Sequence, residues 1–201
     1  MHMRPHCATR SGSGIMWFRS KPIKAGLEVK SQKTKEEGMK VLVTYQSLTG
    51  NTRKVAESIF EVIEQRKEIN EMSQVTTLDD YDLVFLGFPI MGFGPSPEVT
   101  SFLANQAAGK NVALFITHAS PEDSGPLQDW LQKCKTSAGN ANLKGMFHCQ
   151  GELSEQIADF MLKSGDANLA EWAKDRPSTI GQPDAARLQR ARDWAKKLTK
   201  D

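Results

Sequence analysis

Uncharged hydrogen-bonding side chains surround a single glycine early in the regular part of the chain. Ser47, Thr49, Asn51 and Thr52 are donors without charge, and Gly50 between them permits a tight turn that lets a ligand approach the backbone closely. Apolar residues at helical spacing begin directly after this turn, so the free N–H groups and the dipole of a helix N-terminus would face the same point. Such a turn can hold a phosphate group without a metal ion.

Two other interpretations of this turn are weaker. Ser, Thr and Asn are ordinary helix caps, but capping requires one such residue and this turn carries four. A loop for a nucleoside triphosphate would place Lys and then Ser or Thr after the glycine, whereas Asn51 follows Gly50 here. The turn therefore favours a terminal phosphate monoester over a nucleoside triphosphate.

The segments on both sides of the turn are expected to position it. Residues Val41 to Val43 form an uninterrupted apolar run, which is typical of a strand covered on both faces of a parallel sheet. Beyond the turn, Val55, Ile59 and Ile63 recur at the spacing of one helix face. The turn thus connects a buried strand to the start of a helix.

The rest of the chain alternates between strand and helix patterns. Further strands are expected over residues 68–72, 83–88, 112–117 and 145–149. Helices are expected over residues 97–106, 126–135, 153–174 and 181–197. This alternation predicts an α/β fold with right-handed crossovers, a doubly wound five-stranded parallel sheet of strand order 2-1-3-4-5. Its ligand crevice would lie at the carboxyl ends of the first and third strands, where the turn also lies.

The stretch from Ser47 to Thr52, placed directly after a first strand, resembles the phosphate loop of the flavodoxin family, whose ligand is FMN. The resemblance covers nearly all of residues 39–163 and extends more loosely to the final helix. It implies a flavodoxin-like fold with the FMN phosphate in this turn. The residues that it assigns to the phosphate are Ser47, Leu48, Thr49, Gly50, Asn51 and Thr52.

An apolar loop rich in Gly and Pro spans residues 89–97, after the third strand. In proteins similar to flavodoxins the equivalent segment lies against the isoalloxazine ring. The resemblance therefore implies ring contacts from Pro89, Ile90, Met91, Gly92 and Phe93. Phe93 or Met91 is the candidate for stacking on the ring. The alternative is a hydrophobic turn that packs on its own domain; we favour the flavin contact because exposed apolar patches usually mark binding sites.

The loop after the fourth strand, with Thr117 and His118, is expected to reach the ring from the other side. Many flavodoxins place Tyr or Trp against the flavin here, and this chain has neither in this loop or in residues 89–97. His118 would either hydrogen-bond the ring or relay protons, or it is a solvated loop residue, and the sequence favours neither. Cys149 ends a strand on the same side and is expected to be a small buried residue rather than a reactive thiol.

Charge is distributed unevenly along the chain. Residues 1–38 contain eight Lys/Arg and three Asp/Glu, whereas the remaining residues contain 18 and 21. The mildly acidic remainder argues against nucleic acid binding and fits basic redox partners. Three cysteines without a CxxC pair and four histidines without metal-ligand spacing indicate neither a disulfide framework nor a metal site. A reducing cytoplasm is the expected compartment, and no apolar run approaches the roughly 20 residues of a membrane span.

Residues 1–38 are rich in Ser, Gly, Lys and Arg and show no sustained periodicity. We expect a disordered leader or a misassigned start, because Glu36-Glu37-Gly38 before Met39 can be encoded by purine-rich codons that read as a bacterial ribosome-binding site. Residues 39–201 would then form the flavodoxin-like domain, which ends in a helical extension. Residues 164–182 exceed what a minimal flavodoxin needs, and the sequence suggests no function for them.

These observations together predict an FMN-binding, flavodoxin-like electron-transfer protein. Its partners would be a reductase and an acceptor protein, and the cofactor would carry the redox chemistry. The main alternative is an NAD(P)H-dependent FMN or quinone reductase of the same fold. A flavin-free interaction module is a third, weaker alternative, because both ring-side loops lack Tyr and Trp.

Overall fold

The computed structural model describes residues 38–200, in which strands and helices alternate. The expected leader, residues 1–38, lies outside the described residues except for Gly38. Among the helices of the described part, none is long and apolar enough to cross a membrane.

The described strands form one parallel sheet in the order β2-β1-β3-β4-β5, as predicted. Their bounds are Lys40–Tyr45 for β1, Arg66–Glu71 for β2, Leu83–Pro89 for β3, Asn111–His118 for β4 and Asn142–Gln150 for β5. The central strands were predicted closely because their apolar runs are continuous. The edge strands β2 and β5 begin two and three residues earlier than predicted, since their first residues join the sheet through backbone pairing but lack a continuous apolar run.

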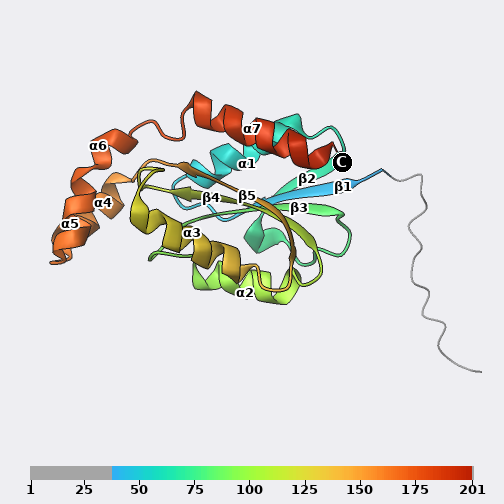
Figure 1. Cartoon of the computed structure of the whole chain (residues 1–201), viewed down its shortest axis with the longest axis horizontal. Helices are drawn as coiled ribbons and strands as arrows, with labels where there is room; N and C mark the ends of the chain where they lie inside the picture. Colours follow the sequence, from blue (N-terminus) through green and yellow to red (C-terminus); the bar gives the residue numbers. More distant parts are fainter. Residues whose placement is uncertain (1–37, 201) are drawn as a thin grey trace, which may run out of the picture. The chain divides into compact units, whose positions relative to one another are not determined.

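Helices cover both faces of the sheet (Figure 1). On one face lie α1 (Asn51–Val62) and α7 (Ala185–Thr199), and on the other lie α2 (Pro97–Gln106) and α3 (Gly125–Ser137). Each face has its own apolar core. Val43, Phe85 and Phe115 pack under α1 and α7, and Leu86 and Leu114 pack under α2 and α3.

The chain between β5 and α7 is helical, as the patterns over residues 153–174 predicted. It forms two helices, α4 (Glu155–Lys163) and α5 (Ala167–Lys174), followed by the short α6 (Arg176–Thr179). The break has a local cause: Gly165 adopts φ 78°, and the Asp166 carboxylate accepts hydrogen bonds from the N–H groups of Asn168 and Leu169, which starts a new helix. These helices lie beyond the end of the sheet at which β4 and β5 finish (Figure 1).

Among the described glycines, Gly87 in β3 has the least room for a side chain. A Cβ atom there would lie 1.9 Å from Cε2 of Phe115, the residue opposite Gly87 on β4. Since Phe115 is fully buried, its ring has no solvent to move into. The missing side chain of Gly87 thus leaves the room that the Phe115 ring occupies.

We therefore expect Gly87→Ala to lower the free energy of unfolding by about 1–3 kcal/mol through overpacking, as measured by urea denaturation. Gly125→Ala is the matched control, because it adds the same methyl group where nothing lies within 4 Å. Adding Phe115→Leu to Gly87→Ala should cost less than the two single changes combined. Additive losses would contradict this account of the contact.

Candidate functional site

The turn that joins β1 to α1 leaves the helix N-terminus open. Gly50 is the N-cap residue and adopts φ 88°, the left-handed conformation that favours glycine, so the helix has no side chain at its N-cap position to accept its first N–H groups. Ser47 Oγ accepts from the N–H of Arg53 at 3.3 Å, and Thr49 is exposed beside it. Leu48 is 66% exposed. Backbone N–H groups and two hydroxyl groups are therefore accessible to an anion at this point.

The other two polar side chains of the turn point into the protein. Asn51 Nδ2 donates to the backbone oxygen of Glu152 at 2.8 Å and to Thr49 Oγ1 at 3.2 Å. Gly151 gives this amide its space, since a Cβ atom there would lie 2.8 Å from Asn51 Nδ2. Thr52 is buried, and its hydroxyl is hydrogen-bonded to that of Thr117 at 2.9 Å. Asn51 and Thr52 thus fix the turn to β4 and to the segment after β5, and only their backbones are available to a ligand.

The loop that follows β3 adjoins the turn. The N–H of Gln46 donates to the carbonyl of Gly87, and Ser96 Oγ donates to Gln46 Oε1 at 3.1 Å. The N–H of Ile90, at the start of the loop, donates to the carbonyl of Thr117. The structure therefore brings the three predicted segments together, namely the turn, the loop from Pro89 to Phe93 and the end of β4.

The tip of this loop is a two-residue hairpin. The N–H of Met91 donates to the carbonyl of Gly94 at 2.8 Å, and Gly92 and Phe93 between them have φ values of 59° and 69°. A positive φ at a bulky residue such as Phe93 is strained and persists only where the surroundings hold it. Met91 and Phe93 are 41% and 40% exposed, so the loop presents apolar side chains to solvent.

Two tryptophans hold Phe93 in place. Its ring centroid lies 5.1 Å from that of Trp130 on α3 and 5.6 Å from that of Trp172 on α5. No tryptophan lies within residues 89–97 of the sequence, so these two contacts were not predicted. Trp130 is on the inward face of α3, but nothing in the local pattern around Trp172 indicates that α5 returns to residues 89–97.

His118 is the last residue of β4 and only 5% exposed, so it is not a solvated loop residue. Its Nδ1 lies 2.9 Å from the carbonyl of Ser120, which can only accept, so the neutral ring carries its proton there. Its Nε2 then accepts from Nδ1–H of His148 at 3.1 Å. Both ring nitrogens have partners within the protein, and His118 does not offer a hydrogen bond to a ligand in this arrangement.

Burial determines the charge state of His118, His148 and Cys149. It lowers the pKa of His118 to about 4, with a further contribution from His148, and it also lowers the pKa of His148. Both rings are therefore neutral near pH 7. Cys149 is fully buried, as expected for a small buried residue, and burial raises its pKa to about 12.

The segment after β4 is anchored through Glu122. Its carboxylate accepts from Arg187 Nε at 2.8 Å and from an Arg190 side-chain nitrogen at 2.7 Å, both on α7. It also accepts from the N–H of Gln150 at 3.3 Å. Sequence reasoning missed this anchor, because α7 lies more than 60 residues from Glu122 along the chain.

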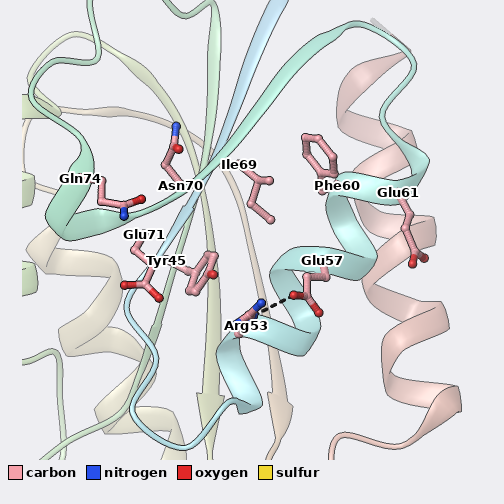
Figure 2. A pocket seen from close by; sticks show the side chains of 9 residues that line it. All are labelled: Tyr45, Arg53, Glu57, Phe60, Glu61, Ile69, Asn70, Glu71 and Gln74. Atoms are coloured by element: carbon pink, nitrogen blue, oxygen red, sulfur yellow. Dashed lines mark hydrogen bonds and ion pairs between the residues drawn. The ribbon is translucent and has the colours of Figure 1, made fainter.

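Two hollows lie on the β2 side of the turn. The larger, of about 480 Å³, is lined by Tyr45, Arg53, Glu57, Phe60, Glu61, Ile69, Asn70, Glu71 and Gln74. Figure 2 shows these side chains coming from α1 on one side and from β1, β2 and the following turn on the other, with Arg53 bonded to Glu57. The smaller, of about 360 Å³, includes Gln46 and Ser47 in its wall. Residues 89–93 line neither of these hollows, and Met91 and Phe93 present apolar side chains to solvent. The described residues contain no cluster of His, Cys, Asp and Glu that could hold a metal ion.

The lowered pKa of buried His118 should make the stability of the fold depend on pH. The folded pKa of His118 is about 4 and the ordinary value is about 6.5, so the unfolded chain binds more protons between these values. The free energy of unfolding should therefore fall as the pH drops through this window, by at most about 1.4 kcal/mol per pH unit for one proton. Urea denaturation across this window should show a shallower dependence for His118→Gln than for the wild type. Equal slopes would contradict the assignment to His118.

Comparisons with known proteins bear on the family of this chain. A family model described as Flavodoxin domain matches residues 42–195, well over half of the chain. The flavodoxin-like domain-containing protein BilS of Clostridioides difficile (strain CD3) is 28% identical over 170 residues, which are 80% of this chain and 96% of that protein.

Solved structures show the same fold. Oxidised Flavodoxin 2 from Bacillus cereus aligns with a TM-score of 0.54 and 17% identity over 80% of this chain and 98% of that one. A flavodoxin from the domain Archaea aligns with a TM-score of 0.50 and 16% identity over 81% and 97%. With the five-stranded sheet and the open turn before α1, the match over residues 42–195 shows that this chain belongs to the flavodoxin family.

Proposed function

We propose that this protein binds FMN and transfers electrons between protein partners. The observation that carries the proposal is the junction of two unlike surfaces at one edge of the sheet. One surface is the open N-terminus of α1 with the hydroxyls of Ser47 and Thr49. The other is the loop that exposes Met91 and Phe93, and the hydrogen bond between Ser96 and Gln46 connects this loop to the turn. A ligand with an anionic end and a flat apolar ring satisfies both surfaces.

The residues divide into two groups by their role toward FMN. Ser47, Thr49 and the backbone N–H groups from Gly50 onward would hold the phosphate, and Pro89 to Phe93 would lie along the ring. Asn51, Thr52 and Thr117 would fix the spacing between these two regions. The bound flavin supplies one- or two-electron chemistry, and the protein binds, orients and shields it.

Exposed apolar side chains around the proposed site support transfer between proteins. Leu48 of the turn and Ile157, Phe160 and Leu162 of α4 are all more than one-third exposed, and α4 packs through Ala158 on the segment after β4. Apolar surface of this kind marks interaction sites on soluble proteins. A reductase and an acceptor protein are the partners that an electron carrier requires.

The phosphate contacts can be tested by comparing FMN with riboflavin, which lacks the phosphate. Thr49→Val and Ser47→Ala should each weaken FMN binding about tenfold or more, because hydrogen bonds to a charged group contribute about 1.5–3 kcal/mol. Riboflavin binding should change little, as measured by flavin fluorescence titration of the apoprotein. Ser101→Ala, at an exposed position of α2, is the matched control. Equal losses for both ligands would place the phosphate elsewhere.

The electron-carrier role can be separated from that of a reductase of the same fold. We expect NADH and NADPH to leave the flavin of the holo-protein oxidised, whereas the photoreduced holo-protein should pass electrons to cytochrome c. Absorbance of the flavin and of cytochrome c follows both steps. Rapid bleaching by NAD(P)H with sustained reduction of a quinone would instead establish the reductase.

A further inference from the structure

We propose that the helices inserted between β5 and α7 complete the ring site, and that Trp172 on α5 is the aromatic side chain that lies against the flavin ring. This inference rests on the FMN binding proposed above. It gives a role to residues 164–182, for which the sequence alone suggested no function.

The inserted helices contact both loops that border the proposed ring site. The Trp172 ring lies 5.6 Å from that of Phe93, in the loop after β3. Ala158 of α4 and Ala173 of α5 form a small core with Leu153, against which Ala119 of the segment after β4 packs. The insertion therefore meets the chain where it leaves β3 and where it leaves β4.

The Trp172 side chain retains area for a ligand. It is 38% exposed although it touches two other aromatic rings. Its plane is inclined by 77° to Phe93 and by 69° to Trp130, so it is stacked flat on neither. Together with Met91 and Phe93 at the tip of the loop, Trp172 forms an apolar surface that a flat ring can cover.

Neither loop beside the proposed ring site supplies an electron-rich aromatic side chain. Residues 89–97 and 119–124 contain no Trp or Tyr, and Phe93 is engaged with two indoles. Isoalloxazine is electron-poor, and an electron-rich indole stacks on it better than an aliphatic side chain. The strained φ of Phe93 is held by the same two tryptophans, so Phe93 is a positioning residue for Trp172.

Contact between indole and flavin can be measured without any activity assay. An indole against the ring quenches flavin fluorescence by electron transfer over a few ångströms, so bound FMN should be dark in the wild type. We expect Trp172→Phe to retain FMN affinity within about twofold and to brighten bound FMN severalfold, because phenylalanine still packs on the ring but does not donate an electron. Trp172→Ala should weaken FMN and riboflavin binding by the same factor, roughly three- to tenfold.

Trp130→Phe is the matched control, since Trp130 belongs to the same aromatic cluster but lies on α3. It should leave bound FMN dark. If Trp172→Phe leaves the flavin dark, or if Trp172→Ala binds both ligands like the wild type, this inference is overturned while FMN binding stands. A loss for FMN but not for riboflavin would also overturn it, because the effect would then act through the phosphate turn. Failure of the folded wild type to bind either flavin would instead overturn the proposed function.

Discussion

A buried hydrogen bond between the hydroxyls of Thr52 and Thr117 sets the geometry of the candidate site. It joins the start of α1 to the end of β4 across the intervening end of β3, at 2.9 Å. Both residues are almost fully buried, so separating them would leave two hydroxyls without partners, at a cost of about 1–3 kcal/mol each. Gly87 and Phe115 keep the strands beneath this bond in close contact. The distance from the open helix N-terminus to the apolar loop is therefore set by this buried contact as well as by the hydrogen bonds of Gln46 to Gly87 and Ser96.

The fold was predictable wherever burial and local pattern agree. The continuous apolar runs of β1, β3 and β4 and their alternation with helices were enough for the strand order, because crossover handedness leaves few alternatives. The edge strand β2, of sequence RKEINE, has no such run and is held by pairing with β1, so its bounds were less accurate. The division of residues 153–174 depended on the φ of Gly165 and on the Asp166 cap, which compete with a helical apolar pattern that continues past them.

The candidate site was predictable only in its local part. The open turn from Ser47 to Thr52 could be read from six consecutive residues, because its donors are adjacent in sequence. The contacts that orient it could not, since Thr52 and Asn51 find partners 65 and 101 residues away. The same holds for His118, whose Nε2 finds its hydrogen-bond partner in His148 on the neighbouring strand. Residue types indicated what the site could bind, and long-range packing decided which side chains are available to do so.

The position of the helical insertion follows from the topology of the sheet. In a doubly wound sheet, the carboxyl ends of the parallel strands meet at one edge, so an insertion after β5 enlarges the site without disturbing the pairing of β1, β3 and β4. Residues 152–184 carry seven Asp/Glu and three Lys/Arg, while Ile157, Phe160 and Leu162 of α4 remain exposed. These helices therefore add little to the core. An acidic and apolar surface beside the proposed ring site would suit basic redox partners. The insertion that we propose to border the flavin would then also form part of the surface that a partner contacts.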